Sequence, residues 1–150
     1  MRIYEAKLSF HLIQEGPAEP VSNPAKIVEY MRGGFDELPL NEMLYVIILD
    51  RRNKPMGRHR VTIGTATSAL AHPREVFRIA VASSAAAIVV VHNHPSGDPS
   101  PSAADVQITR LLKDGGRTLE IALLDHVIIG NPTDDPLGRG YYSFREAGIL

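Results

Sequence analysis

Two histidines separated by one residue carry the clearest chemical meaning in this sequence. His92 and His94 follow the apolar run at residues 86–91, and side chains two positions apart in an extended strand point to the same side. Asp105 follows, after a proline-rich loop. Two imidazole nitrogens and one carboxylate form a three-ligand zinc set whose fourth position stays open to water, as in catalytic zinc sites. The spacing therefore predicts a metal centre at His92, His94 and Asp105.

A hydrolytic zinc site also needs a residue that accepts and returns a proton. Glu42 is the candidate, because it directly precedes the apolar run at residues 43–49. If that run is a strand lying antiparallel beside residues 86–91, Glu42 is next to His92. Ser102 supplies a hydroxyl group able to stabilise an oxyanion. Each residue also has a simpler interpretation: Ser102 and Asp105 have the spacing of a helix capping box, and Glu42 is a solvated residue at the start of a strand.

Other histidine motifs fit the sequence poorly. A metallo-β-lactamase pattern requires Asp and His shortly after the histidine pair, where Ser96 and Gly97 stand, and a HExxH helix is absent. The chain has no cysteine, which excludes disulfides, thiol nucleophiles and the cysteine-ligated zinc of nucleobase deaminases. No phosphate-binding GxxxxGK[ST] or GxGxxG segment occurs.

The hydrophobic pattern around these residues predicts an α/β domain with a mixed β-sheet flanked by helices. Apolar runs predict strands at residues 43–49, 57–65, 86–91 and 119–129, the first two forming a hairpin. Helical spacing and end signals predict helices at residues 24–32, 73–83 and 102–114, the last ending at a Gly115-Gly116 C-cap. Ser143 and Glu146 have capping-box spacing, which predicts a short final helix. Alternating apolar residues at 4–12 predict an extra strand, so we divide the chain into residues 1–22 and a domain at 23–150.

Composition sets the remaining bounds. The 150 residues are 44% hydrophobic and 22% charged, which is typical of one globular domain with a real core. With 16 basic and 17 acidic residues, total charge does not indicate a strongly basic nucleic-acid binder. No segment approaches the length of a membrane span. We expect a soluble cytoplasmic protein without a membrane partner, and the sequence leaves its oligomeric state open.

The same residues resemble a known family. His92-x-His94-Pro95 together with Ser102 and Asp105 resembles the JAMM/MPN zinc isopeptidase signature. The longer stretch at residues 72–112, which contains HNHPSGDPSPS, and LLDHVIIG at 123–130 are similar to the C-terminal domain of the bacterial RadC family. The resemblance extends roughly from Pro24 to the C-terminus.

This resemblance implies a single MPN-type α/β domain with cytidine-deaminase-like layering. It implies Zn²⁺ held by His92, His94 and Asp105, Glu42 as general base and Ser102 as oxyanion stabiliser. The implied activity is that of a zinc metallopeptidase or isopeptidase, in which zinc-activated water attacks the carbonyl of a protein or peptide substrate. All five positions of the motif are filled.

A second interpretation concerns DNA. RadC-type proteins usually carry an N-terminal helix-hairpin-helix region, for which residues 1–22 leave no room, so a DNA role attached to that region does not transfer. The alternative function is a DNA-repair-associated accessory module with a structural or vestigial metal site. Five basic residues of the first hairpin are candidate phosphate contacts, although a solvated hairpin tip is the commoner arrangement: Arg51, Arg52, Lys54, Arg58 and Arg60.

Asp125 and His126 also carry chemistry within an apolar strand. One interpretation is that they hydrogen-bond to a metal-ligating histidine and hold it in place. The other, which we favour, is that their hydrogen bonds are made to nearby groups without any role at a metal.

Overall fold

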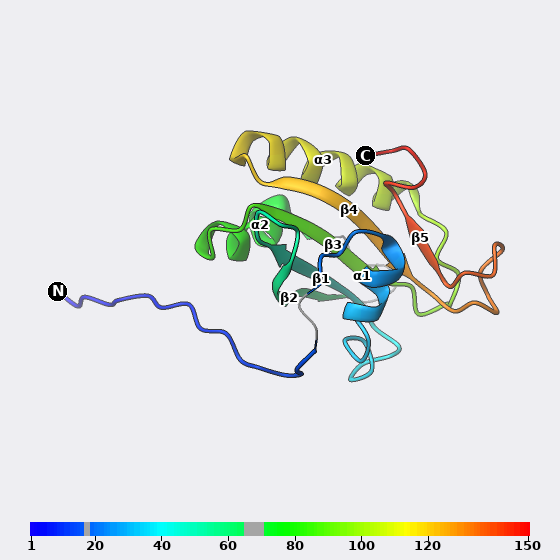
Figure 1. Cartoon of the computed structure of the whole chain (residues 1–150), viewed down its shortest axis with the longest axis horizontal. Helices are drawn as coiled ribbons and strands as arrows, with labels where there is room; N and C mark the ends of the chain where they lie inside the picture. The colour runs from blue at the N-terminus through cyan, green and yellow to red at the C-terminus, as the bar shows by residue number, and fades with distance from the viewer. Residues whose placement is uncertain (17–18, 65–70) are drawn as a thin grey trace.

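A mixed five-stranded sheet forms the centre of the protein (Figure 1). The computed structural model describes residues 1–16, 19–64 and 71–150. The strands are β1 (Glu42–Leu49), β2 (Pro55–Gly64), β3 (Ala87–Asn93), β4 (Ala122–Ile129) and β5 (Tyr141–Ser143). Their spatial order is β2-β1-β3-β4-β5. Only the β3–β4 pair is parallel among these strands, and the other three pairs are antiparallel.

The central position of β1 and β3 follows from their composition. Every residue of β3 is buried, as is every residue of β1 after Glu42, and continuous runs of branched apolar residues are typical of strands covered on both faces. The two strands pair antiparallel with Leu44 opposite His92. The expected hairpin of β1 and β2 is present. The start of β1 therefore lies beside the end of β3, where the histidine pair begins.

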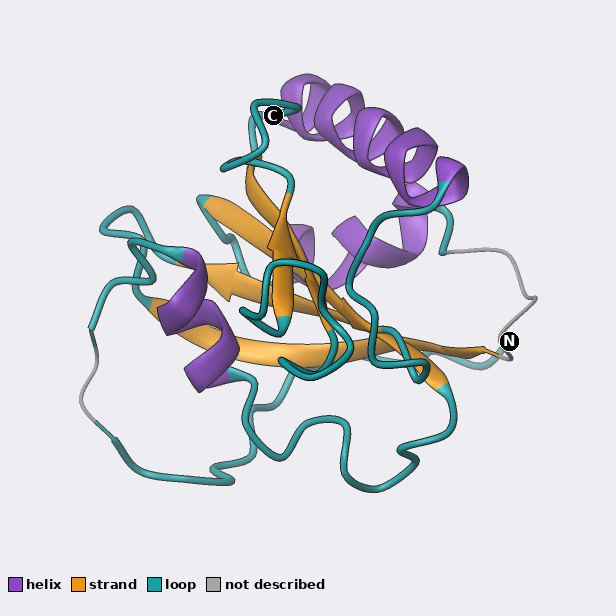
Figure 2. Cartoon of the chain, turned by 90° about the vertical axis from the view of Figure 1, so that its right-hand side faces the viewer, coloured by secondary structure: helices purple, strands orange, loops and turns teal. Residues whose placement is uncertain are grey.

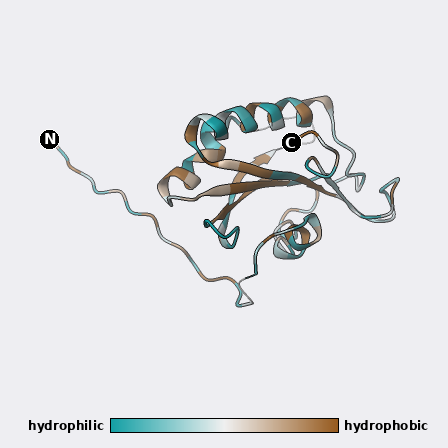
Figure 3. Cartoon of the chain, turned by 45° about the horizontal axis from the view of Figure 1, so that its top comes forward, coloured by the Kyte–Doolittle hydropathy of each residue, from teal (hydrophilic) through white to brown (hydrophobic). Residues whose placement is uncertain are grey.

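Helices cover both faces of the sheet (Figure 2). They are α1 (Pro24–Tyr30), α2 (Pro73–Ala82) and α3 (Ala103–Leu119). On β1, Leu44, Val46 and Ile48 pack in the core shared with α2 and α3. The alternate β1 residues belong to the second core, which contains Ile27 of α1. Figure 3 shows the apolar strands between these helices. The predicted α/β class, a mixed sheet flanked by helices, is confirmed.

Helix α3 differs from the prediction at its C-terminal end. It continues through Gly115 and Gly116 to Leu119 and ends at Glu120, which adopts a left-handed conformation with φ 55°. The glycines serve close packing instead of capping, because a Cβ atom on Gly116 would collide with the carbonyl oxygen of Ile121. The following strand accordingly begins at Ala122, three residues later than expected.

The predicted strand at residues 4–12 is wrong. The structure assigns no strand to residues 1–16, and Tyr4 and Leu12 are 82% and 77% exposed. Within this segment, the Phe10 ring lies against Gly57 of β2. Alternation supplies an apolar stripe, but a strand is stabilised only where that stripe meets another layer. Residues 17–18 of the expected N-terminal segment, and Thr65 of the expected second strand, lie outside the described residues.

The C-terminal prediction is also corrected. Residues 144–148 form turns, with no final helix. The capping bond predicted at Ser143 is present, since its hydroxyl accepts a hydrogen bond from the Glu146 N–H. Gly148, however, has φ +75°, a left-handed conformation that does not continue a helix beyond the first turn. Across the described ranges, no helix has the length and apolar character needed to cross a membrane.

Candidate metal centre

Four side chains from separate parts of the fold meet at the end of β3. Glu42 begins β1, His92 lies near the end of β3, His94 follows that strand, and Asp105 lies in the first turn of α3. Each offers one nitrogen or oxygen atom, and these atoms all lie within 4.8 Å of one another. The sequence-predicted ligand residues and the predicted base are thus brought together in one group that can hold a metal ion.

Three of the four residues come close to the spacing of a tetrahedral site, with the two histidines facing different oxygens of Asp105. His92 Nε2 lies 3.1 Å from His94 Nε2 and 3.2 Å from Asp105 Oδ1, while His94 Nε2 lies 3.4 Å from Asp105 Oδ2. Ligands that bind zinc tetrahedrally at roughly 2.0–2.1 Å are separated from one another by about 3.3–3.4 Å. The nitrogen and oxygen donors therefore fit zinc in type, and their separations, which involve both oxygens of Asp105, are close to those of zinc ligands.

The capping box of α3 orients the carboxylate. Asp105 Oδ2 accepts a hydrogen bond of 2.7 Å from the Ser102 N–H, and Ser102 Oγ accepts one of 3.1 Å from the Asp105 N–H. Asp105 is both the third helical residue of the capping box and a group that faces the cluster, so the two interpretations of Ser102 and Asp105 are compatible. Burial alone would raise the pKa of Asp105, but the neighbouring His92 and His94 imidazoles and the Ser102 N–H hold it well below its usual value, which keeps the carboxylate ionised.

A buried hydrogen-bond chain fixes the tautomer of His92. The Thr109 hydroxyl donates to the carbonyl oxygen of Asp105 at 2.6 Å, so the bond of 2.6 Å between Thr109 Oγ1 and His126 Nδ1 must be donated by His126. His126 Nε2 then accepts from His92 Nδ1 at 2.8 Å. The proton of His92 is thereby held on Nδ1, and the lone pair of Nε2 faces the cluster.

His94 is oriented in a different way. Its Nδ1 lies 2.8 Å from the carbonyl oxygen of Asp98, which can only accept, so His94 donates there and its Nε2 lone pair also faces the cluster. The backbone helps, because the His94 N–H donates to the Ile129 carbonyl oxygen at 2.9 Å and extends the pairing of β3 with β4 by one residue. Both imidazoles therefore present Nε2 to a cation.

Glu42 lies on the solvent side of this group. Its Oε1 is 3.9 Å from His92 Nε2, and its side chain is 21% exposed whereas that of His92 is fully buried. The position follows from the antiparallel β1–β3 pairing, which the sequence offered as a hypothesis and the register confirms. The carboxylate can contact a water molecule that shares the cluster with a cation.

Comparison with known proteins shows the family of this chain. A family model for the RadC-like JAB domain matches residues 21–149. The chain belongs to the RadC-like JAB domain family. It is 48% identical over 124 residues to a UPF0758 protein of Chlorobaculum parvum, covering 83% of this chain and 52% of that protein. A UPF0758 protein of Thermotoga maritima is 47% identical over 109 residues, covering 73% and 46% of the two chains. The chain thus spans about half the length of the curated relatives it matches.

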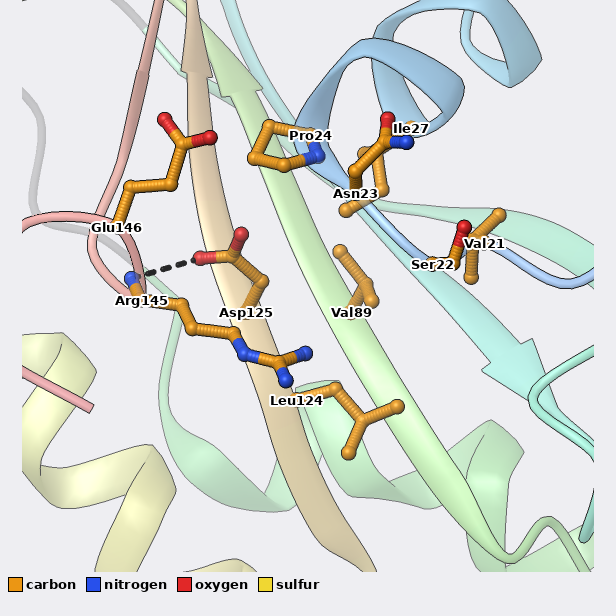
Figure 4. Close-up of a pocket in the computed structure, with 10 residues that line it drawn as sticks. All are labelled: Val21, Ser22, Asn23, Pro24, Ile27, Val89, Leu124, Asp125, Arg145 and Glu146. Carbon is orange, nitrogen blue, oxygen red and sulfur yellow. Dashed lines mark hydrogen bonds between the residues drawn. The ribbon is translucent and has the colours of Figure 1, made fainter.

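Two residues behind the candidate ligands of this RadC-like JAB domain differ in role. His126 supports His92, contrary to the local pairing that we favoured from sequence. Asp125 accepts a local hydrogen bond from the His126 N–H, and further bonds from the Ser143 hydroxyl and the Arg145 N–H. Figure 4 shows Asp125 and Arg145 in a pocket beside α1, on the other face of the sheet from α2 and α3. Thr109 was not singled out from sequence, since a threonine within a helix carries no signal of its own.

The basic residues of the hairpin are partly committed to internal contacts in the RadC-like JAB domain. Arg58 donates to the Tyr30 carbonyl oxygen at 2.9 Å, and Arg60 forms an ion pair of 2.8 Å with Glu37. Arg51 and Arg52 remain exposed at the turn. The hairpin therefore offers fewer free cations for a phosphate backbone than its composition indicates.

Proposed function

We propose that this RadC-like JAB domain is a zinc-dependent hydrolase of the JAMM class that cleaves peptide or isopeptide bonds. The proposal depends most on one observation: two Nε2 lone pairs and an ionised carboxylate are separated by 3.1–3.4 Å at the edge of a polar cluster. His92, His94 and Asp105 would hold Zn²⁺. A site with three protein ligands leaves a position for water or substrate, as in catalytic zinc sites.

Glu42 would transfer the protons. Zinc bound at these residues supplies Lewis acidity, which makes water nucleophilic near neutral pH. The Glu42 carboxylate, held close to His92 and open to solvent, accepts the proton that the attacking water releases. It then returns this proton to the leaving amine, so one carboxylate acts as base and afterwards as acid.

Ser102 would stabilise the oxyanion. Its Oγ accepts a hydrogen bond from the Asp105 N–H, so its own proton is free to donate. A hydroxyl fixed at the start of a helix is a preorganised donor for charge that develops on a substrate carbonyl oxygen. The preference for an amide carbonyl rests on the similarity of the His92-x-His94-Pro95, Ser102 and Asp105 pattern to the zinc isopeptidase signature. The proposed site of action is the cytoplasm. A chain without cysteine has no disulfide that the reducing conditions there could break.

The test compares zinc content and hydrolysis in matched carboxylate variants. The unmodified chain, Glu42→Gln and Glu29→Gln are loaded with zinc and incubated with a peptide library, including isopeptide-linked peptides. We expect one zinc per chain in all three, cleavage by the unmodified chain and by Glu29→Gln, and none by Glu42→Gln. Glu29 is an exposed residue of α1, so its variant controls for loss of a carboxylate outside the cluster.

Two results would overturn the proposal. One is the absence of tightly bound zinc from the unmodified chain. The other is cleavage by Glu42→Gln at the rate of the unmodified chain. Tight DNA binding whose salt dependence is carried by Arg51 and Arg52, without hydrolysis, would instead favour the accessory-module alternative.

A further inference from the structure

Asn93 stands between the two histidines, and its side chain holds the backbone on both sides of Glu42. Asn93 Oδ1 accepts a hydrogen bond of 2.7 Å from the Met43 N–H. Its Nδ2 donates one of 3.0 Å to the carbonyl oxygen of Asn41. Asn93 is only 7% exposed. One buried amide thus bridges the two peptide groups that flank the proposed base.

These two bonds occur where the backbone pairing of the strands stops. The last paired residues of β1 and β3 are Leu44 and His92, so neither Met43 nor Glu42 has a partner on the β3 backbone. The Asn93 side chain takes over the pairing for one more residue. The backbone around Glu42 is therefore tied to the segment that carries both histidines.

We propose that Asn93 is the positioning residue of Glu42, setting the distance between the proposed base and the metal ligands. This inference rests on the proposed function. An asparagine suits the task because its amide donates and accepts at once. Aspartate at position 93 could accept from Met43 but could not donate to Asn41. Alanine could do neither, and glutamine would carry the amide one methylene further.

A purely structural role for Asn93 makes a different prediction. If the residue only stabilises the end of β3, its loss should disturb His92 and His94 as much as Glu42. If it positions Glu42, its loss should change Glu42 while the histidine responses persist, because their tautomers are fixed by His126 and Asp98. The histidines and Glu42 must therefore be observed separately.

The experiment follows both groups by NMR during a Zn²⁺ titration of the full chain. Histidine ¹⁵N resonances report the ligands, and the Glu42 carboxyl ¹³C resonance reports the base. In Asn93→Ala we expect Zn²⁺ still to shift the histidine resonances. The Zn²⁺ affinity read from these shifts should be within about threefold of that of the unmodified chain. We expect the zinc-induced shift of Glu42 to fall to less than half. Asn41→Ala is the matched control, because it keeps the backbone carbonyl that Asn93 uses and should behave like the unmodified chain.

Amide exchange of Met43 in the metal-free protein tests the same contact without zinc. We expect exchange at least about tenfold faster in Asn93→Ala and unchanged in Asn41→Ala. Asn93→Asp keeps the acceptor for Met43 and serves if the alanine variant does not fold. It should show near-normal Met43 exchange and a partial loss of the Glu42 shift.

The outcomes separate this inference from the proposed function. If Zn²⁺ does not shift the histidine resonances of the unmodified chain, the zinc function is overturned. The amide exchange of Met43 then decides whether Asn93 holds the backbone at Glu42. A Glu42 shift in the Asn93 variants equal to that of the unmodified chain overturns the positioning role. So does a loss of histidine and Glu42 shifts in equal proportion.

Discussion

His92 and His126 share a buried hydrogen bond of 2.8 Å between Nδ1 and Nε2, and both side chains are fully buried. This contact links a candidate ligand on β3 to a residue on the neighbouring strand β4. Burial holds the pKa of His126 well below its usual value, so His126 is neutral and its Nε2 can accept a hydrogen bond from His92. The neutral partner behind the ligand decides which nitrogen of His92 faces a cation.

Thr109→Val should weaken zinc binding by about 10- to 100-fold, the usual effect of losing an outer partner of a ligand histidine. Without the hydroxyl, His126 Nδ1 loses its acceptor, and the tautomer that leaves Nε2 of His92 free is no longer enforced. Competition with a chelator measures the affinity.

The matched control for this prediction is Thr118→Val. Thr118 lies in the same helix and makes the same type of bond, to the carbonyl oxygen of Asp114 at 3.2 Å, but on the exposed side. Equal zinc affinities for the two valine variants would exclude a role for the Thr109 hydroxyl at the metal centre.

Ser102 variants can separate the helix cap from the catalytic hydroxyl. Ser102→Ala should lower the free energy of unfolding by about 1 kcal/mol, whereas glycine at an N-cap costs only a few tenths of that value. Both variants lack the hydroxyl, so both should lose hydrolysis against the peptide library. Denaturant unfolding and the cleavage assay give the two readouts. If Ser102→Gly kept its hydrolytic activity and only the less stable Ser102→Ala lost it, the proposed oxyanion role would be contradicted.

Asp125 should make stability fall as pH rises. Burial raises the pKa of its carboxyl above the usual value, so the folded state holds the proton longer than the unfolded state. The stability gained from this protonation is present at low pH and is lost as pH rises from the unfolded pKa through the folded one. The residue in Asp125→Asn cannot titrate. The free energy of unfolding of this variant, taken relative to that of the unmodified protein, should therefore be higher at pH 7 than at pH 3.5.

Denaturant unfolding of the metal-free protein at the two pH values checks this prediction, with Asp135→Asn as control. Backbone hydrogen bonds from Leu137, Gly140 and Arg139 lower the pKa of Asp135, so the pH effect of its replacement should have the opposite sign. Parallel pH profiles for Asp125→Asn and the unmodified protein would contradict the account of Asp125.

Gly116→Ala should destabilise the protein even though alanine is the better helix former. A Cβ atom at this position would meet the carbonyl oxygen of Ile121, and overpacking of this kind costs about 1–3 kcal/mol. At Gly115 the nearest atom is in the flexible Phe77 side chain, at 3.3 Å, so Gly115→Ala should cost less. Thermal unfolding of both variants measures the difference, and equal melting temperatures would argue against the close approach of α3 to the chain before β4.

The group of Glu42, His92, His94 and Asp105 could be predicted in part from local rules, once an antiparallel pairing of two strands was assumed. Strand parity places His92 and His94 on one side, and the antiparallel pairing of two apolar runs brings Glu42 beside them. The supporting residues were not predictable in this way. Thr109 and His126 come from a helix and a strand, and nothing in their own neighbourhoods shows that their side chains meet.

The errors in the fold have similar causes. Residues 4–12 alternate as a strand should, but periodicity does not show whether a second layer exists to cover the apolar side. Gly115 and Gly116 have the composition of a helix end, whereas their function depends on Ile121 and Phe77 packing against them. In both cases the deciding contact is tertiary, and it overrides the local preference.

The coordination of zinc in the loaded protein tests the central claim most directly. X-ray absorption at the zinc edge should show one zinc per chain, bound by two imidazoles and by oxygen at roughly 2.0–2.1 Å. His94→Ala should lose one imidazole from this set, whereas replacing exposed His11 should leave it unchanged. A zinc signal that is the same in His94→Ala and the unmodified chain, or the absence of bound zinc, would contradict the account.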